Sequence, residues 1–140
     1  MQRLYPYYVK INNRTDLYQL QDGRFQLIKQ GPLDSMMVGY KYVLVKNSVA
    51  DYLHSLGIER VTFKPAIVWN RASDTEDLSY TQVLVNHHFN TEDINDLDIE
   101  GSQFLIMDQR YLFVTPGLKS KLEKSSLGWT FSAGLSSFFG

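Results

Sequence analysis

Two stretches of the chain share one pattern of hydrophobic and polar positions. Each begins with a short apolar run, continues with apolar residues spaced three or four apart, and closes with a second apolar run. The first stretch spans residues 42–63 and the second spans residues 111–131. A short apolar run is typical of a buried strand, and spacing by three or four is typical of one helical face. The pattern therefore predicts two strand–helix–strand units.

The two stretches align as an internal repeat with an offset of 69 residues. The aligned pairs are Tyr42 with Tyr111, Val45 with Val114, Val49 with Leu118, Leu53 with Leu122 and Ile58 with Leu127. One residue is then lost, so that residues 61–63 align with residues 129–131. A repeat of this kind permits a twofold relation between the copies but does not require one.

Helix boundaries are marked by residues with known preferences at helix ends. In the first unit Asn47 or Ser48 is expected to cap the helix, because a side-chain oxygen there can accept an unpaired N–H of the first turn. Gly57 lies where a left-handed residue commonly ends a helix. In the second unit we expect Thr115 to be the cap, with Pro116 in the first helical position.

The N-terminal residues read as strands. Residues 5–11 are rich in Tyr, Val and Ile, and Asp22-Gly23 is a turn signal between the apolar segments 17–20 and 25–28. We therefore predict an N-terminal antiparallel meander. Together with the two units, this gives an α+β fold in a single domain, residues 1–140. The prediction is one mixed sheet of about seven strands with two or three helices packed on it.

The segments between the two units carry further strand and turn signals. The closing strand of the first unit, Val61–Trp69, contains Pro65, which favours a sheet edge or a bulge. Residues 70–79 are polar and predict a loop, residues 80–85 predict a strand, and residues 103–114 predict a hairpin. Phe138 and Phe139 near the C-terminus either pack back on the domain or meet a partner.

Composition narrows the class of protein. The chain has 140 residues, 44% of them hydrophobic, with no cysteine and a net charge of −1. The absence of cysteine excludes disulfides and thiolate metal sites. The near-neutral charge gives no field that would attract nucleic acid or an anionic membrane. No signal peptide is visible, and no run reaches the ~20 apolar residues that a membrane helix needs. We expect a soluble cytoplasmic protein with neither of those partners.

Negative charge is concentrated in the middle of the chain. Residues 65–110 contain nine Asp and Glu against two Arg, and the segments on either side are mildly basic. An acidic surface of this kind can dock a basic protein, although a solvated face is the plainer explanation. The residues that we select as the candidate partner-binding surface are Asp74, Glu76, Asp77, Asp93, Asp96, Asp98 and Glu100.

Other site chemistries are not indicated by the sequence. His87 and His88 are adjacent, so on a strand they point to opposite faces and cannot both bind one metal ion. Counting from Asp93, the Gly and Glu that an EF-hand needs are missing. The chain also lacks a nucleophile elbow and a phosphate-binding loop. We therefore predict no catalytic residues, no metal and no cofactor.

With these motifs in view, residues 40–131 resemble a bacterial immunity-protein family of polymorphic toxin systems, long classed as a domain of unknown function. The similarity in the first unit lies at Val45, Val49, Leu53, Gly57, Ile58, Val61, Phe63 and Pro65. It continues through residues 83–86, residues 93–102, residues 112–114 and residues 118–122. The chain departs from the family pattern at three positions: Asn47 and Thr115 replace a Ser, and Ser126 replaces a Gly.

The resemblance implies a non-catalytic protein that binds and occludes a cognate toxin in the cytoplasm. Toxins that act on nucleic acids are often basic, which would suit the acidic surface. Two alternatives remain open: an accessory domain that binds some other protein, and a small enzyme with an unrecognised carboxylate site. Neither the toxin, the face that binds it nor the oligomeric state follows from the sequence.

Overall fold

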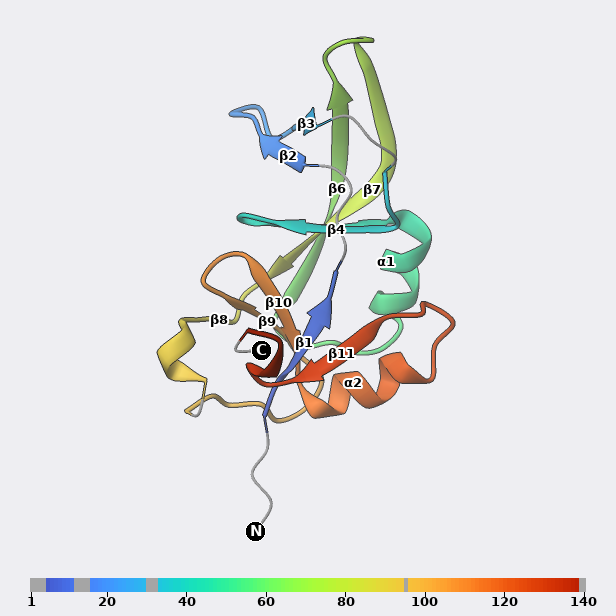
Figure 1. Ribbon diagram of the computed structural model, residues 1–140. Helices are drawn as coiled ribbons and strands as arrows, with labels where there is room; N and C mark the ends of the chain where they lie inside the picture. The colour runs from blue at the N-terminus through green and yellow to red at the C-terminus, as the bar shows by residue number, and fades with distance from the viewer. Residues whose placement is uncertain (1–4, 12–15, 30–32, 95, 139–140) are drawn as a thin grey trace. The chain divides into compact units, whose positions relative to one another are not determined.

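The computed structural model describes residues 5–11, 16–29, 33–94 and 96–138 (Figure 1). Within these residues the chain forms an α+β fold, mostly of strands, with the α-helices α1 (Asn47–His54) and α2 (Pro116–Glu123). Two short 3-10 helices, η1 (Thr91–Asp93) and η2 (Ser136–Phe138), follow β8 and β11. The strands belong to two sheets, both of which mix parallel and antiparallel pairs.

The chain divides into two compact units, unit 1 and unit 2, which differ from the two strand–helix–strand stretches of the sequence repeat. Unit 1 comprises residues 1–10, 53–61 and 85–140, and unit 2 comprises residues 11–52 and 62–84. The five-stranded sheet has the order β11 (Thr130–Ala133), β1 (Tyr7–Lys10), β10 (Tyr111–Val114), β9 (Phe104–Met107) and β8 (His88–Phe89). The six-stranded sheet has the order β2 (Asp16–Gln19), β3 (Phe25–Lys29), β6 (Val61–Asn70), β7 (Thr75–Val85), β5 (Tyr42–Lys46) and β4 (Met36–Gly39).

The core of unit 1 is an aromatic cluster on one face of the five-stranded sheet. Its fully buried members are Phe89, Leu105, Met107 and Phe113. Alternate residues of β9 and β10 are buried as well, so both faces of these strands are covered. Phe138 packs on the cluster, with its ring centroid 6.1 Å from that of Phe113 in a stacked arrangement. Phe138 therefore belongs to the core of unit 1, whereas Phe139 lies outside the described residues.

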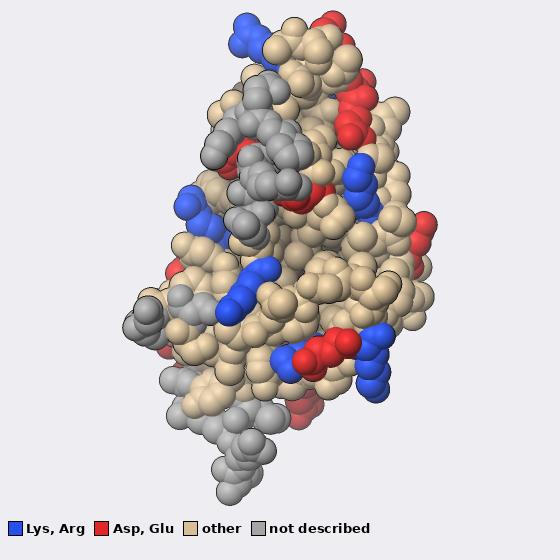
Figure 2. All heavy atoms as spheres, turned by 45° about the vertical axis from the view of Figure 1, so that its right-hand side comes forward, with Lys and Arg blue, Asp and Glu red and all other residues tan. Residues whose placement is uncertain are grey.

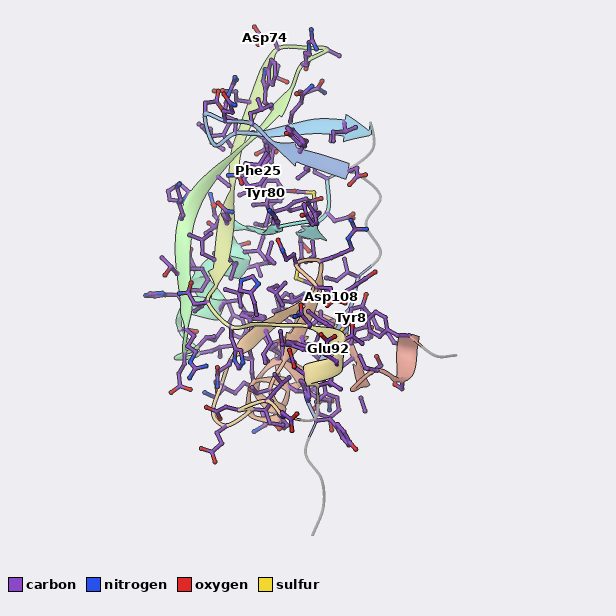
Figure 3. The ribbon with its side chains drawn as sticks, turned by 90° about the vertical axis from the view of Figure 1, so that its left-hand side faces the viewer. Tyr8, Phe25, Asp74, Tyr80, Glu92 and Asp108 are labelled. Atoms are coloured by element: carbon purple, nitrogen blue, oxygen red, sulfur yellow. The ribbon has the colours of Figure 1, made fainter. Side chains whose placement is uncertain are left out.

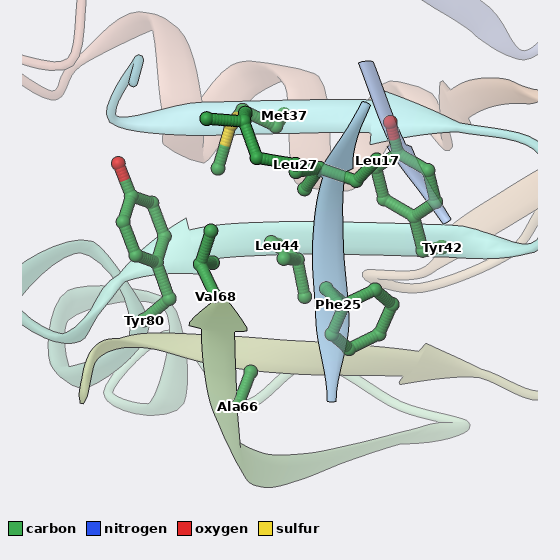
Figure 4. Close-up of a cluster of buried hydrophobic side chains, with 9 residues drawn as sticks. All are labelled: Leu17, Phe25, Leu27, Met37, Tyr42, Leu44, Ala66, Val68 and Tyr80. Carbon is green, nitrogen blue, oxygen red and sulfur yellow. The ribbon is translucent and has the colours of Figure 1, made fainter. Parts of the chain in front are cut away.

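The core of unit 2 is enclosed by the six-stranded sheet (Figure 4). All six strands contribute to one buried cluster, which consists of Leu17, Phe25, Leu27, Met37, Tyr42, Leu44, Ala66, Val68 and Tyr80. Leu17 comes from one end of the strand order and Met37 from the other. A flat sheet cannot bring its two ends together, so the sheet must curl around this core.

Several local predictions are confirmed. β2 and β3 form the antiparallel hairpin predicted at Asp22-Gly23, with Gly23 at φ 95°. β9 and β10 form the second predicted hairpin. Thr115 caps α2 through its side chain, and Pro116 is the first residue of that helix. Gly57 has φ 68°, as expected for a left-handed residue after α1. Residues 42–63 contain β5, α1 and the start of β6, and residues 111–131 contain β10, α2 and the start of β11.

Four predictions are wrong. There are two sheets instead of one, and the N-terminal meander does not form, because β1 pairs with β10 and β11 while β2 and β3 belong to the other sheet. Residues 70–79 are not a loop: β6 and β7 extend into them and leave only a turn at residues 71–74. Of the two cap candidates for α1, Asn47 and Ser48, Asn47 is wrong, because its side chain instead bonds β7 at Leu78 O and Thr81 Oγ1.

Candidate partner-binding surface

Residues 90–101, the acidic segment, follow β8 and cover the aromatic cluster of unit 1. Ile94, Leu97 and Ile99 are partly buried and pack against that cluster. The carboxylate-bearing residues Asp93, Asp96, Asp98 and Glu100 are all exposed. From residue 96 to residue 100 polar and apolar positions alternate, so the aliphatic side chains hold the segment down and the carboxylates face solvent. Asn95 lies outside the described residues.

The N-terminal end of the acidic segment is fixed by the turn between β9 and β10. Asp108 in that turn accepts a hydrogen bond from the Thr91 hydroxyl at 2.6 Å and another from the Thr91 N–H at 3.2 Å. Within the segment, the N–H of its first residue, Asn90, donates to the Asp93 carboxylate at 3.4 Å. Figure 3 shows Asp108 beside the segment, near Glu92. Hydrogen bonds to an ionised acceptor are stronger than neutral ones, so Asp108 is a firm anchor for this end.

The C-terminal end is held by three successive carbonyl groups, each bonded from a different part of unit 1. Gln103 Nε2 donates to Glu100 O at 2.8 Å, and the Thr115 hydroxyl donates to Gly101 O at 2.7 Å. The Glu59 N–H donates to Ser102 O at 2.8 Å. With three consecutive peptide groups bonded, the backbone at this end has little conformational freedom.

Gly117 allows the close approach of α2 to the acidic segment. A Cβ atom at position 117 would lie 2.5 Å from Gly101 O, which is a clash with backbone. Gly101 itself has φ 71°, a conformation that residues with a side chain rarely adopt. Both glycines are therefore needed for Thr115 to reach the Gly101 carbonyl.

Arg60 forms an ion pair with the acidic segment. The Arg60 guanidinium lies 3.8 Å from the Asp98 carboxylate, and both side chains are at least half exposed. At this distance and exposure the pair contributes at most about 1 kcal/mol. Arg60 also has φ 56°, which is unusual for a residue other than glycine. Among the described residues, the carboxylate-bearing side chains at positions 93, 96, 98 and 100 remain exposed.

The other three predicted residues lie in unit 2, where each is bonded to a nearby side chain. Asp74, in the turn after β6, accepts a hydrogen bond from Trp69 Nε1 at 3.1 Å. Glu76 forms an ion pair with Arg24 at 3.3 Å, and the Arg24 guanidinium also lies over the Trp69 ring. These carboxylates thus stabilise the β6–β7 hairpin and the turn beside it.

Asp77 on β7 is also bonded internally. It accepts hydrogen bonds from both the backbone N–H and the hydroxyl of Ser79. Partial burial alone would raise the pKa of the Asp77 carboxyl, but the hydrogen bonds from Ser79 and the nearby Lys46 outweigh it and lower the pKa. A carboxyl held ionised by its own neighbours has less to gain from a partner than one that faces solvent.

The seven predicted residues therefore fall into two groups, one in each unit. Four lie in the acidic segment of unit 1 and three in the β6–β7 hairpin of unit 2. The molecular face in Figure 2 is mostly uncharged, with acidic and basic side chains scattered over it.

The two adjacent histidines have separate partners. His87 Nδ1 lies 3.0 Å from Gln103 Oε1, whereas His88 Nε2 lies 2.8 Å from Val85 O. Over the described ranges, no group of three or more His, Asp or Glu side chains is arranged to hold a metal ion. The helices of the same ranges include none long and apolar enough to cross a membrane.

Three residues that fix the acidic segment were missed as functional residues from the sequence: Gln103, Thr115 and Asp108. Thr115 was predicted only as a helix cap, and Asp108 and Gln103 only as part of the hairpin at residues 103–114. Gln103 is 3% exposed, an uncommon burial for glutamine. A polar residue at the start of an otherwise apolar strand was the only signal for it in the sequence.

No family model, curated protein or solved structure matches the chain in the comparisons made.

Proposed function

We propose that this protein is a toxin-neutralising immunity protein, which binds and occludes a basic cognate toxin in the bacterial cytoplasm without catalysis. The observation that carries the proposal is the acidic segment, whose carboxylates face solvent while its backbone is fixed at both ends. The family resemblance supplies the class of partner, and the acidic segment supplies the chemistry that would recognise it.

Fixed geometry favours tight binding, because a partner does not have to order the segment. Immobilising a flexible loop on association costs about 0.5–1.5 kcal/mol per ordered side chain, in addition to the backbone. The hydrogen bonds between Thr91 and Asp108 and between Gln103 and Glu100 already order the two ends of the segment in the free protein, so association does not have to order them. Solvent-facing carboxylates also accelerate association with a basic protein and repel acidic ones.

The experiment is co-expression with the toxin-like protein encoded by the neighbouring gene. We expect the wild-type protein to restore growth and to form a stoichiometric complex. A variant with Asp96→Asn, Asp98→Asn and Glu100→Gln should bind about 10- to 100-fold more weakly, and its association should depend less on salt. Unchanged affinity in this variant would refute the role of the acidic segment.

The matched control neutralises the three carboxylates of the β6–β7 hairpin through Asp74→Asn, Glu76→Gln and Asp77→Asn. It removes the same number of charges, so a general loss of electrostatic attraction would weaken both variants equally. We expect the hairpin variant to retain most of its affinity, because these carboxylates are bonded within unit 2. Failure of the wild-type protein to bind or to rescue would favour the accessory-domain and enzyme alternatives.

We also infer that residues 42–63 and 111–131 are copies of one strand–helix–strand unit. In support, α1 and α2 begin at Asn47 and Pro116, which matches the sequence offset of 69. β5 and β10 each pair with the preceding strand in an antiparallel hairpin. In both sheets one strand separates the opening strand from the closing strand: β7 lies between β5 and β6, and β1 lies between β10 and β11.

A further inference from the structure

The side chain of Gln103 connects His87 to the backbone of the acidic segment. Its amide is buried, with Nε2 2.8 Å from Glu100 O and Oε1 3.0 Å from His87 Nδ1. The backbone of Gln103 is fixed too, because its N–H donates to Thr115 Oγ1 and its carbonyl accepts from the Thr115 N–H, both at 3.0 Å. The amide is thus the only adjustable part of this residue.

The partners determine which way the amide points. A backbone carbonyl can only accept a hydrogen bond, so the atom facing Glu100 O must be Nε2. Oε1 then faces His87 and can only accept, so His87 Nδ1 must carry a proton. The reversed amide would place two acceptors against each other at Glu100.

Arg60 lies against the same ring nitrogen of His87 as Gln103 does. Arg60 Nη1 lies 3.5 Å from His87 Nδ1, beyond the usual range for a hydrogen bond. A guanidinium only donates, and Nδ1 has no free lone pair when it is protonated. A hydrogen bond from Arg60 would need an unprotonated Nδ1 and therefore competes with the Gln103 bond. We assign the tautomer from the shorter of the two contacts, the 3.0 Å contact with Gln103.

We propose that His87 and Gln103 form a latch, in which the Nδ1-protonated form of His87 orients the Gln103 amide so that it holds Glu100 and the end of the acidic segment in place. Gln103 is thus a positioning residue, and His87 acts through it. The latch matters for partner binding only if the proposed function is correct. Its conformational part stands independently and can be tested on the free protein.

The first test is nitrogen-15 NMR of the histidine side chains in the full chain. The proton of neutral His87 is expected on Nδ1, and in Gln103→Leu that preference should be lost. A merely space-filling role for Gln103 would not affect the tautomer. Finding neutral His87 of the wild-type protein protonated on Nε2 overturns the proposal.

The second test is hydrogen exchange measured peptide by peptide. Gln103→Leu should accelerate exchange in residues 96–102 by about tenfold or more, the effect of losing roughly one buried hydrogen bond. Leu122→Ala is the matched control, because it creates a cavity under α2 without touching the latch. Acceleration confined to residues 96–102 in Gln103→Leu alone supports the latch, whereas the same spread of acceleration in both variants overturns it.

His87→Ala provides a milder variant should Gln103→Leu fail to fold. It should accelerate exchange in the same peptide, and this comparison with the wild-type protein tests the latch by itself. When Gln103→Leu does fold, the double variant should exchange no faster than Gln103→Leu, since both substitutions break the same pair of hydrogen bonds. Additive effects of the two substitutions overturn the coupling. None of these measurements uses a partner, so failure of the latch and failure of the proposed function give different results.

Discussion

Thr115 is the residue whose replacement should reveal most about how unit 1 is held together. Its side chain is fully buried, and its hydroxyl accepts hydrogen bonds from the N–H groups of Gln103 and Leu118 and donates one to Gly101 O. A hydroxyl has two lone pairs and one proton, so it is fully satisfied here. Thr115→Val preserves the shape and removes all three bonds at once.

The expected loss of stability can be added up from these contacts. Losing a helix cap costs about 0.5–2 kcal/mol, and each further buried bond contributes a net ~0.5–1.5 kcal/mol. We therefore expect Thr115→Val to lower the free energy of unfolding by about 2–4 kcal/mol. For a chain of this size that corresponds to a fall in Tm of about 5–15 °C.

The assay is urea unfolding followed by the fluorescence of Trp129, which lies in unit 1. Trp69→Phe in every variant removes the other tryptophan, which belongs to unit 2. Thr115→Ser is the control, because it retains the hydroxyl and loses only a methyl group. If Thr115→Val unfolds within about 0.5 kcal/mol of Thr115→Ser, the three bonds are not stabilising and the reasoning fails.

Three further outcomes are expected. Phe138→Ala should destabilise unit 1 by about 2–3 kcal/mol, because its ring packs on Tyr8, Tyr111 and Phe113; an unchanged urea midpoint would contradict its place in the core. Asp108→Ala should accelerate hydrogen exchange at residues 90–93, because it removes both hydrogen bonds to Thr91. Asp108→Asn keeps one acceptor oxygen and should have a smaller effect. Equal exchange in the two variants would count against Asp108 as the anchor. Burial, followed by the nearby Asp77 and Asp34, raises the pKa of Tyr80 to about 12, so its contribution to stability is complete below pH 10 and is lost as the pH rises to 12. Tyr80→Phe should flatten that part of the stability curve, and an identical pH dependence in both proteins would exclude Tyr80 as its source.

Local sequence signals predicted the elements well, because the residues responsible act on their own neighbours. Asp22-Gly23 specifies a turn, and Thr115-Pro116 specifies a helix start, whatever the rest of the chain does. The pairing of β1 with β10 and β11 could not be predicted in this way, since it joins residues more than 100 positions apart. Residues 75–79 were misread because pairing in a sheet outweighs their polar composition.

The candidate surface was predictable in part for the same reason. The alternation of carboxylates and aliphatic residues in the acidic segment is visible in the sequence and has a direct structural meaning. The hydrogen bonds that fix the two ends of the segment cannot be recognised in the sequence, because each joins the segment to a residue distant along the chain. Asp108 bonds Thr91, and Thr115 bonds Gly101. Only the folded chain brings these residues together.

The alternation in the acidic segment separates two kinds of evolutionary freedom. Substitutions at Asp96, Asp98 and Glu100 change an exposed surface, and such changes usually alter stability by no more than about 0.5 kcal/mol. Substitutions at Ile94, Leu97 and Ile99 disturb the cover of the aromatic cluster. A lineage could therefore exchange the charges, and with them the partner that the proposed function assigns to this surface, while the fold stays the same.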